Sequence, residues 1–467
     1  MKSLAGRVHI VGVGGAGMSG IARVLLARGV QVSGSDAKES RRLTSLSPLG
    51  AHVYVGHDAS RMLQAGQPDV LVISTAISPE NVEVKAATSH GIPILNRAQA
   101  LAELMSDSVG VSVAGTHGKT TTTSMLTVIL QQAGKDPSFV IGSEMNESGS
   151  NAHQGTGDLF VAEADESDGT FLMLPSHAAI VTNVEPDHLN YWGSFTKLEQ
   201  AFVDFVVANS ADSGFAVVCG DDSGANRIAQ LAKQEQANVI TYGTSLDSDA
   251  VLTILPSDSA GALFTVTYGG EVHGPIQLAV PGRHNALNAT AAFVAAIELG
   301  CTAKQAIAGL VAFTGTHRRF EFRGEVSKVR VFDDYAHHPT EIEAVLNAAR
   351  TVANGGRVLV AFQAHHFYRT ALFSKEFGQA LGLADFVVVL EVFAPGETPI
   401  PGASGSVMAS NVPLADGSVV FEPSWSAVPA LLANNAKSGD IIMTLGAGDI
   451  GMMCPQILEL LEQRSAL

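Results

Sequence analysis

The chain has 467 residues, a formal net charge of −17 at neutral pH, and 46% apolar against 16% charged residues. This length exceeds what one hydrophobic core serves and predicts about three domains of a globular protein. The acidic balance argues against a nucleic-acid-binding surface, which needs a basic field, although local lysines and arginines can still hold phosphate groups.

Cysteine usage and hydropathy indicate the compartment. The three cysteines are scattered and predict free, mostly buried thiols in a reducing environment: Cys219, Cys301 and Cys454. No apolar run reaches the ~18 residues of a membrane span. The run Val8–Val13 passes straight into glycines and is interpreted as a strand rather than a signal peptide. We expect a cytoplasmic protein without a membrane or nucleic-acid partner.

The first domain, predicted over residues 1–107, opens with a dinucleotide-type fingerprint. A strand over Val8–Val13 leads into G-x-G-x-x-G, then a helix over Met18–Arg28 and a strand over Val30–Ser35. The glycines let backbone N–H groups approach a diphosphate, and Asp36 follows at the spacing typical of a ribose contact. The candidate diphosphate-binding residues are Gly12, Gly14, Gly15 and Gly17.

The fingerprint by itself indicates a nucleotide diphosphate and leaves NAD open, so a dehydrogenase remains an alternative. A further strand over Asp69–Ser74 ends in Ser74, Thr75 and Ala76, a candidate second contact at the carboxyl edge of the sheet. His57 and Arg97 lie in short loops and are interpreted as solvated. A helix over Arg97–Met105 leads to a linker near residues 106–108.

The central domain, predicted over residues 108–315, begins with a phosphate-binding loop. The strand Val109–Ala114 enters a glycine turn, and a helix is expected over Thr121–Gln132. Backbone N–H groups and the helix dipole favour an anion there, Lys119 adds charge for the β- and γ-phosphates, and Thr120 is placed for Mg²⁺. The usual pattern would have glycine at position 113, where this chain has Val113. The candidate ATP-binding run is Gly115, Thr116, His117, Gly118, Lys119, Thr120 and Thr121.

Carboxylates follow the next two predicted strands of this domain, Leu159–Ala162 and Ala178–Val184. Acidic side chains at strand ends beside a phosphate loop hold Mg²⁺ in nucleotide hydrolases and transferases. Helix capping explains Ser167 and Asp168 equally well, but not a glutamate directly on a strand. Glu163 is therefore the first metal candidate, while His188 is open between a ligand and a structural polar residue.

Antiparallel hairpins are predicted over residues 251–280, and a helix over Ala289–Leu299 follows. Asn285 and Asn288 lie one helical turn apart, so their amides share a face and can read an adenine edge. Helix capping by one of the two asparagines is the alternative.

The last domain, predicted over residues 316–467, alternates strand and helix signals again, which favours an α/β unit with a mostly parallel sheet. The predicted strands are Val329–Phe332, Arg357–Phe362, Phe386–Val392 and Asp440–Leu445, and the predicted helices are Pro339–Val352, Leu372–Leu381 and Ile450–Glu462. Polar groups gather after two of its strands, in Asp333–Pro339 and Gln363–Arg369. Arg318 and Arg319 lie near the predicted interdomain junction, from which they could reach a phosphate.

Taken together, the motifs GTHGKT, EADESD, VTNVEPDH, GRHNALNA, HRRFE and DDYAHHPTE resemble the Mur ligase family over essentially the whole chain. The resemblance implies an α/β protein of three domains: a Rossmann-like N-terminal domain that binds UDP rather than NAD, a central P-loop ATPase-like domain, and a C-terminal Rossmann-like domain for ATP and the amino acid. The N-terminal GGAGMSGIA narrows it to the branch that attaches L-alanine to UDP-N-acetylmuramate.

The resemblance also implies roles for individual residues. Lys119, Arg319 and His337 would be catalytic, and Thr120, Glu163 and His188 would hold Mg²⁺, with Mn²⁺ as an alternative. Asn285, Asn288, Arg319 and Asp334 would contact ATP; Tyr335, His337 and Arg369 would face the amino acid and muramyl group. His337 as the base that takes the amine proton is a hypothesis.

Two departures from the family pattern stand out. The carbamylated lysine of related ligases has no counterpart in residues 202–207, so no modified lysine is expected. The family's F-Q-P-H-R-Y-[ST]-R-T is replaced at positions 364, 366 and 367, while Arg369 is retained. The expected reaction is ligation through an acyl phosphate, by a monomer or weak homodimer. The rivals are a sibling ligase that takes a peptide, an NAD-dependent oxidoreductase, and a non-catalytic nucleotide-binding regulator.

Overall fold

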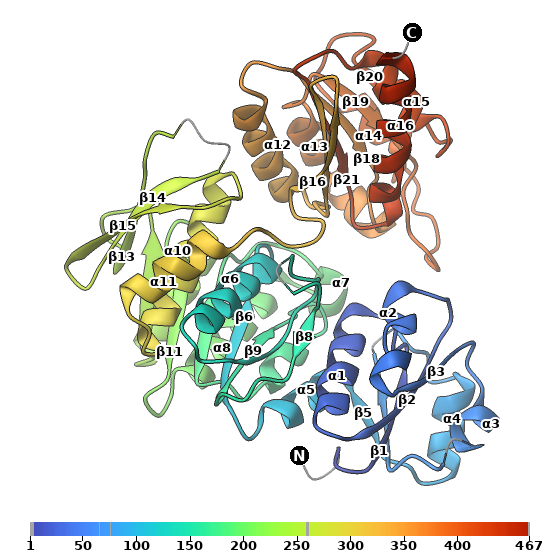
Figure 1. Ribbon diagram of the computed structural model, residues 1–467, viewed down its shortest axis with the longest axis vertical. Coiled ribbons are helices and arrows are strands. Elements are labelled where there is room, and N and C mark those ends of the chain that lie inside the picture. The colour runs from blue at the N-terminus through green and yellow to red at the C-terminus, as the bar shows by residue number, and fades with distance from the viewer. Residues whose placement is uncertain (1–3, 65, 75, 147, 258–260, 466–467) are drawn as a thin grey trace. The chain divides into compact units, whose positions relative to one another are not determined.

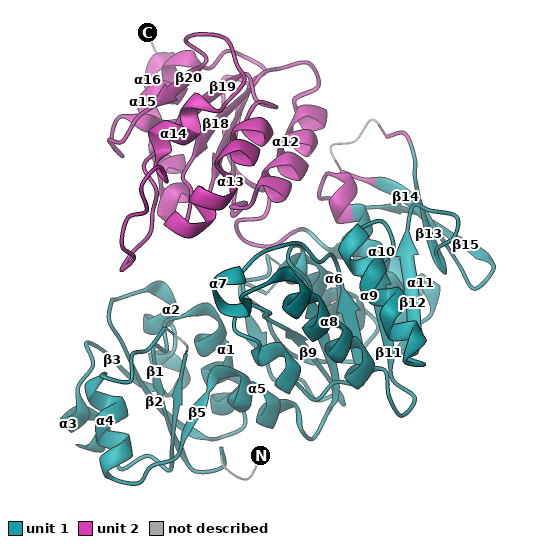
Figure 2. Ribbon diagram, turned by 180° about the vertical axis from the view of Figure 1, so that it is seen from behind, with its two compact units in different colours: residues 1–255, 263–277, 286–314 teal, residues 256–262, 278–285, 315–467 magenta. Residues whose placement is uncertain are grey.

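The computed structural model describes residues 4–64, 66–74, 76–146, 148–257 and 261–465. The described chain is α/β with mostly parallel sheets and divides into two compact units (Figure 2). Unit 1 comprises residues 1–255, 263–277 and 286–314, and unit 2 comprises residues 256–262, 278–285 and 315–467. The predicted boundaries at 107 and 315 stay predictions.

The N-terminal part of unit 1 is a five-stranded parallel sheet in the order β3-β2-β1-β4-β5 (Figure 1). Apolar side chains of α3 and α4 bury one face of it, because Met62, Val84 and Ala87 pack against Val11 and Leu71. The elements are β1 (Arg7–Val11), α1 (Ala16–Ala27), β2 (Gln31–Asp36), α2 (Arg41–Thr44), η1 (Ser47–Leu49), β3 (His52–Val55), α3 (Ala59–Gln64), β4 (Val70–Ile73), α4 (Val82–Ser89), β5 (Ile94–Asn96) and α5 (Arg97–Met105).

The central part of unit 1 is a ten-stranded sheet in the order β15-β14-β13-β12-β11-β10-β6-β9-β7-β8. Its middle strands are parallel. The pairs β13–β14 and β14–β15 are antiparallel, as predicted for residues 251–280, and the pair β7–β8 is antiparallel as well. The strands are β6 (Val109–Ala114), β7 (Ser138–Val140), β8 (Ala152–His153), β9 (Leu159–Glu163), β10 (Ala178–Val181), β11 (Phe215–Cys219), β12 (Val239–Gly243), β13 (Ala250–Ile254), β14 (Leu263–Tyr268) and β15 (Glu271–Gln277).

Helix α6 follows β6 and is buried from Thr120 to Leu130. Thr123 Oγ1 and Thr127 Oγ1 donate to the helix carbonyls Lys119 O and Thr123 O, at 2.8 Å each, so these polar side chains can occupy the core. Gly309 lets α11 approach α6 closely, since a Cβ there would lie 2.4 Å from Ile129 Cα. The helices are α6 (Lys119–Gln132), η2 (Thr170–Met173), α7 (Leu189–Trp192), α8 (Phe195–Asn209), α9 (Ser223–Gln234), α10 (Arg283–Glu298) and α11 (Ala303–Ala312).

Unit 2 contains a six-stranded sheet in the order β16-β17-β21-β18-β19-β20, parallel except for the hairpin β16–β17. Two apolar clusters cover its faces. The elements are β16 (Glu321–Val326), β17 (Val329–Asp334), α12 (Pro339–Ala353), β18 (Val358–Phe362), α13 (Phe367–Leu381), β19 (Phe386–Val389), α14 (Gly405–Ser410), β20 (Val419–Phe421), α15 (Val428–Asn435), β21 (Ile441–Leu445), η3 (Asp449–Met453) and α16 (Cys454–Ser465).

Most predicted elements are confirmed within a few residues, and two helices begin earlier than predicted. Helix α10 starts at Arg283, so neither Asn285 nor Asn288 caps it, and the capping alternative is wrong. Helix α13 starts at Phe367 and is interrupted by non-helical angles at Phe373. All three cysteines are free and buried, as predicted. In the described part of the chain, no helix combines the length and apolar character that crossing a bilayer requires.

Candidate functional site

The loop between β6 and α6 has the backbone shape of a phosphate cradle. Gly115 and Gly118 have φ of 132° and 80°, which favours glycine. A Cβ at Gly115 would lie 2.1 Å from Thr182 Oγ1, and one at Gly118 would lie 2.7 Å from Asn288 Oδ1. The loop is anchored to the segment after β10, where Asn183 Oδ1 accepts from His117 N at 2.7 Å. The loop therefore leads into the amino end of α6, and side chains larger than glycine do not fit at positions 115 and 118.

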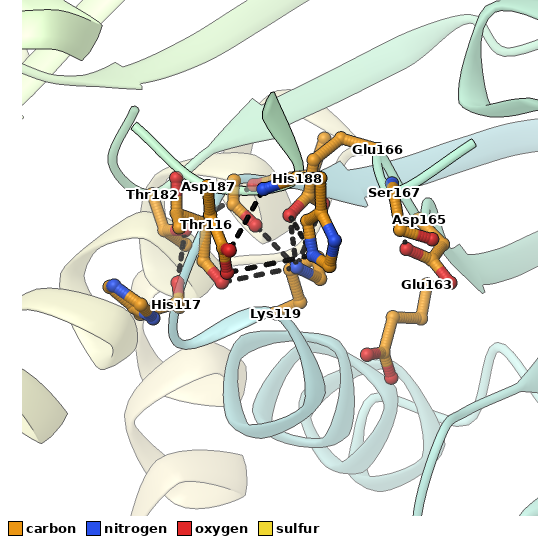
Figure 3. Close-up of polar contacts among 12 residues, drawn as sticks. Thr116, His117, Lys119, Glu163, Asp165, Glu166, Ser167, Thr182, Asp187 and His188 are labelled. Carbon is orange, nitrogen blue, oxygen red and sulfur yellow. Dashed lines mark hydrogen bonds and ion pairs between the residues drawn. The ribbon is translucent and has the colours of Figure 1, made fainter. Parts of the chain in front are cut away.

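Lys119 lies at the first position of α6 with its ammonium folded back over this loop (Figure 3). Its Nζ donates to Gly115 O at 2.6 Å, to Thr116 O at 3.2 Å, and to Glu166 Oε2 at 2.8 Å. Burial opposes the charge on Lys119, but the carboxylates of Glu166 and Asp165 outweigh it and raise its pKa. Lys119 therefore stays cationic, as a phosphate-binding lysine must.

Glu166 is the carboxylate that supplies this counter-charge, and it is only 2% exposed. Burial raises the pKa of Glu166 to about 7, although Lys119 pulls it down. The opposite charges of Lys119 and Glu166 offset the cost of burying each other. We take the charged pair as the state near neutral pH, because Lys119 Nζ lies 2.8 Å from Glu166 Oε2.

Glu163 and Thr120 form the pair expected at a magnesium site. Thr120 Oγ1 donates to Glu163 Oε1 and Oε2 at 3.0 and 3.1 Å, and Gly142 N donates to Oε2 at 2.7 Å. Adjacent oxygen ligands of an octahedral Mg²⁺ lie about 3 Å apart. One hydroxyl and one carboxylate at this separation fit an ion that keeps most of its water, as Mg²⁺ does.

His188 lies near this group but contacts other carboxylates. Its Nε2 is 3.6 Å from Asp187 Oδ2 and 4.0 Å from Glu166 Oε1. The residue has φ of 52°, a left-handed conformation that is uncommon for a non-glycine residue. The structure thus brings His188 to the Lys119–Glu166 pair, and its role as a metal ligand stays a prediction.

The glycine loop of the first domain is held by the end of β2. Gly12 N donates to Ser35 O at 2.8 Å, and Gly14 N donates to Asp36 Oδ2 at 2.9 Å. Ser74 Oγ lies 3.8 Å from the position a Cβ would take at Gly12. Asp36 therefore braces the loop in this state, Ser74 lies beside it, Ala76 is exposed, and Thr75 lies outside the described residues.

Asn285 and Asn288 lie one turn apart on α10, as predicted. Asn285 Nδ2 donates to Pro281 O at 2.6 Å, which fixes the amide at the start of the helix. Asn288 is buried, and its Oδ1 faces Gly118 of the phosphate loop. The second asparagine is thus next to the predicted ATP phosphates within unit 1.

In unit 2, the two arginines of HRRFE have different environments. Arg318 donates from Nε to Asp333 Oδ2 and from its two Nη atoms to Gly448 O and Gly446 O, at 2.7–2.8 Å. Arg319 is 3.8 Å from Glu341 through Nη1 and lies over the Tyr335 ring at 5.3 Å. The Arg318 guanidinium is therefore occupied by structural hydrogen bonds within unit 2, and Arg319 is the better candidate for contacting a phosphate.

The remaining predicted residues of unit 2 gather at the carboxyl ends of its strands. Burial raises the pKa of Asp334 to about 6, against bonds from Phe320 N and Ala336 N and the charge of Arg319. His337 Nδ1 lies 3.0 Å from Tyr335 O, a pure acceptor, so Nδ1 carries the proton and Nε2 the lone pair. Burial lowers the pKa of His337 to about 3, and Arg369, itself buried, adds to this effect against the opposing charge of Glu341.

The segment that departs from the family pattern is anchored by residues farther along the chain. His366, with φ of 72°, contacts Glu397 through Nδ1, and Phe367 N donates to Glu397 Oε2 at 3.0 Å. His365 stacks on Phe393. Glu397 thus fixes the amino end of α13, the helix that carries Arg369.

Sequence reasoning missed two charged contacts at the site. It did not pair Glu166 with Lys119, and it interpreted Arg97 as solvated, whereas Arg97 Nη2 donates to Asp165 Oδ2 at 2.8 Å. The acidic run after β9 signals carboxylates beside the lysine. Nothing local signals Arg97, because its partner lies 68 positions away.

Three family models match the chain in succession: "Mur ligase family, catalytic domain" at residues 7–108, "Mur ligase middle domain" at 113–296, and "Mur ligase, glutamate ligase domain" at 318–448. A UDP-N-acetylmuramate–L-alanine ligase of Acidothermus cellulolyticus is 56% identical, covering 98% of this chain and 96% of the relative.

Solved structures agree with these matches. The alanine ligase MurC of Thermotoga maritima has a TM-score of 0.82 and 27% identity, covering 99% of this chain and all of that one. A murein peptide ligase of Psychrobacter arcticus has a TM-score of 0.72 and 26% identity, covering 98% of each chain. The phosphate loop, the paired Thr120 and Glu163, and these matches along the full length have one explanation: the chain belongs to the Mur ligase family.

Proposed function

We propose that this chain is an ATP-dependent ligase that joins L-alanine to the lactyl carboxylate of UDP-N-acetylmuramate, a step of peptidoglycan precursor synthesis. The observation that carries the proposal is Lys119, charged and folded over a glycine loop beside the Thr120–Glu163 pair. The 56% identity to an alanine ligase over nearly the whole chain supports the choice of acceptor.

The first step is phosphoryl transfer. A lactyl carboxylate oxygen attacks the γ-phosphorus of ATP, the bond to the β-phosphate oxygen breaks, and ADP and an acyl phosphate form. Lys119, the N–H groups at the start of α6, and Arg319 stabilise negative charge on the transferring group. From the family resemblance we assign Asn285 and Asn288 to contacts with ATP, of which Asn288 lies beside Gly118 of the phosphate loop, and Asp334 to the ATP ribose.

Thr120 and Glu163, with His188, are the residues that would hold Mg²⁺ or Mn²⁺ at this site. The bound ion would neutralise charge on the β- and γ-phosphates. The 3.0–3.1 Å separation of the Thr120 and Glu163 oxygens supports this assignment.

The second step is attack of the alanine amine on the acyl carbon, after which the bond to phosphate breaks and inorganic phosphate leaves. The amine must be neutral when it attacks and loses a further proton afterwards. His337 presents a lone pair at Nε2, but a pKa near 3 makes it a weak base. We therefore assign His337 an orienting hydrogen bond to the amine, and Tyr335 and Arg369 contacts with the amino acid and muramyl group.

The glycine loop formed by Gly12, Gly14, Gly15 and Gly17 would hold the diphosphate of UDP, with Asp36 bracing it and Ser74 and Ala76 nearby. The ligase would act in the cytoplasm as a monomer or weak homodimer. No modified lysine takes part in this scheme.

The test is phosphate release from ATP and Mg²⁺ with UDP-N-acetylmuramate, with L-alanine present or omitted. We expect release that needs both substrates and a product heavier by one alanyl residue. Lys119→Ala should lower kcat at least about 100-fold, because it removes a charge that contacts the transferring group.

Other outcomes would support the rivals. Release with a tripeptide but not with alanine would move the assignment to the peptide-attaching sibling. Binding of ATP without turnover by any acceptor would indicate a regulator, and NADH binding at the glycine loop would indicate an oxidoreductase.

A further inference from the structure

The first domain contacts the central domain of unit 1 through the helix that follows the glycine loop. A Cβ at Gly20 of α1 would lie 2.9 Å from Val140 Cγ1 and 3.4 Å from Ala152 Cβ. Asn151 Nδ2 donates to Ala16 O at 2.6 Å. Helix α1 is thus packed on the β7–β8 hairpin, and β7 is paired with β9, the strand that ends at Glu163.

Arg97 makes a second connection between the same two domains, next to the glycine loop and Glu163. It is the first residue of α5, a helix fixed by a capping box between Asn96 and Gln99. Its Nη2 donates to Asp165 Oδ2 at 2.8 Å, two residues past Glu163. Its Cδ and Nη1 lie 3.2 Å from the point where Gly17 would carry a Cβ. The Arg97 side chain therefore lies beside Gly17, the last glycine of the diphosphate loop, and bonds Asp165 in the segment that follows β9; β9 and this segment are here called the carboxylate strand.

The proposed reaction, on which this inference rests, needs two ligands bound by different domains to meet. The nucleotide sugar is held by the glycine loop, and the phosphoryl donor is held beside Lys119 and Glu163. A displacement of about 1 Å between reacting groups can cost about 100-fold in rate. A connection between the two loops at this point is placed to fix that separation.

We propose that Arg97 is a positioning residue that ties the diphosphate loop of the first domain to the carboxylate strand of the central domain, and so fixes the approach of the substrate carboxylate to the phosphoryl donor. The alternative is an ordinary surface ion pair without effect on the reaction. The two side chains are 30% and 34% exposed, so partial burial by itself does not decide between them.

The test compares Arg97→Ala and Arg97→Lys with Arg61→Ala, a matched control. Arg61 lies in the same domain, is 58% exposed, and pairs with Asp58 at 3.9 Å. We expect Arg97→Ala to lower kcat about 10- to 100-fold, with KM for ATP and the Kd for UDP within about twofold of wild type. Arg97→Lys should fall in between, because lysine keeps the charge without the planar fork. Arg61→Ala should match the wild type.

A second measurement does not depend on turnover. Amide hydrogen exchange without substrates should rise in residues 12–20 and 163–168 of Arg97→Ala, and not in Arg61→Ala. Unchanged exchange and unchanged kcat would overturn the proposal. A raised KM for UDP-N-acetylmuramate at constant kcat would also overturn it, since Arg97 would then be a substrate ligand. If the wild type itself shows no ligation, the proposed function fails, and the exchange result still reports whether Arg97 ties the two loops.

Discussion

At the scale of single residues, Lys119 and Glu166 balance each other. Glu166 is 2% exposed and gives the buried ammonium a counter-charge in the nucleotide-free protein. Bound phosphates would bring negative charge to the same ammonium. The carboxylate therefore stabilises the protein without nucleotide and competes with nucleotide binding.

Glu166→Gln tests this balance. Removing one partner of a buried pair costs about 3 kcal/mol, so the nucleotide-free variant should unfold at lower temperature than the wild type. Added ADP should raise its melting temperature more than it raises that of the wild type. Calorimetry with and without ADP measures both effects.

Glu80→Gln is the matched control, because Glu80 pairs with Lys85 on an exposed surface where such pairs contribute about 1 kcal/mol or less. An unchanged melting temperature of nucleotide-free Glu166→Gln would show that the pair contributes nothing to stability.

The same residues show what sequence could and could not predict. The phosphate loop and glycine loop were predictable because strand, glycines and helix are contiguous, and backbone geometry is set locally. The Lys119–Glu166 and Arg97–Asp165 pairs join residues 47 and 68 positions apart. Their pairing depends on how β6, β9 and α5 pack, which no local pattern encodes.

At the scale of elements, Arg318 joins three segments of unit 2. Besides Asp333 on β17 and the carbonyls after β21, its own backbone O accepts from Tyr335 N at 2.8 Å. Its φ of 57° is strained for arginine. The guanidinium groups of Arg318 and Arg319 both lie near the Tyr335 ring, at 5.1 and 5.3 Å from its centroid.

Arg318→Lys should therefore behave as a disruptive change although it keeps the charge. Lysine cannot reproduce the fork that meets Asp333, Gly446 and Gly448 together. We expect a loss of about 3 kcal/mol in the stability of unit 2, comparable with breaking a buried pair, and a higher KM for alanine because Tyr335 loses its support. Denaturant unfolding and alanine titration measure the two effects. A stable variant with normal KM would contradict this role. The control is Arg330→Lys, on β17, the strand that carries Asp333.

Helix ends were the least predictable elements, for identifiable reasons. Helix α10 begins at Arg283, directly after Pro281 and Gly282, whereas the predicted start was Ala289. Helix α13 begins at Phe367 because Glu397, from a distant loop, bonds Phe367 N. The start of α13 thus depends on a tertiary contact, whereas the strands, buried apolar runs, were predicted within a few residues.

At the scale of the whole molecule, the two units should respond differently to acid. In unit 2, burial lowers the pKa of His284, His337 and His365 to about 4, 3 and 4. Such a histidine stays neutral in the folded protein but becomes protonated near pH 6.5 in the unfolded chain. Each one therefore lowers the folding stability as the pH falls below 6.5, by about 2 kcal/mol at pH 5. Burial raises the pKa of Asp334 to about 6. Its protonation as the pH falls to 5 therefore adds about 1 kcal/mol to the folding stability, which opposes the effect of the histidines. The contrast with unit 1 rests on these three histidines, which all belong to unit 2.

Native cysteines can report this difference, since buried Cys454 belongs to unit 2 and buried Cys219 and Cys301 belong to unit 1. A net loss of about 5 kcal/mol predicts that labelling of Cys454 by an acid-tolerant disulfide reagent accelerates at least about 100-fold from pH 7 to pH 5, relative to the unfolded chain. Cys219 and Cys301 should not accelerate in this way. The double variant His337→Gln/His365→Gln should remove most of the effect, whereas His153→Gln, an exposed histidine of unit 1, should leave it intact. Equal acceleration at all three cysteines would show that the acid response is global, and the buried histidines of unit 2 would not be its source.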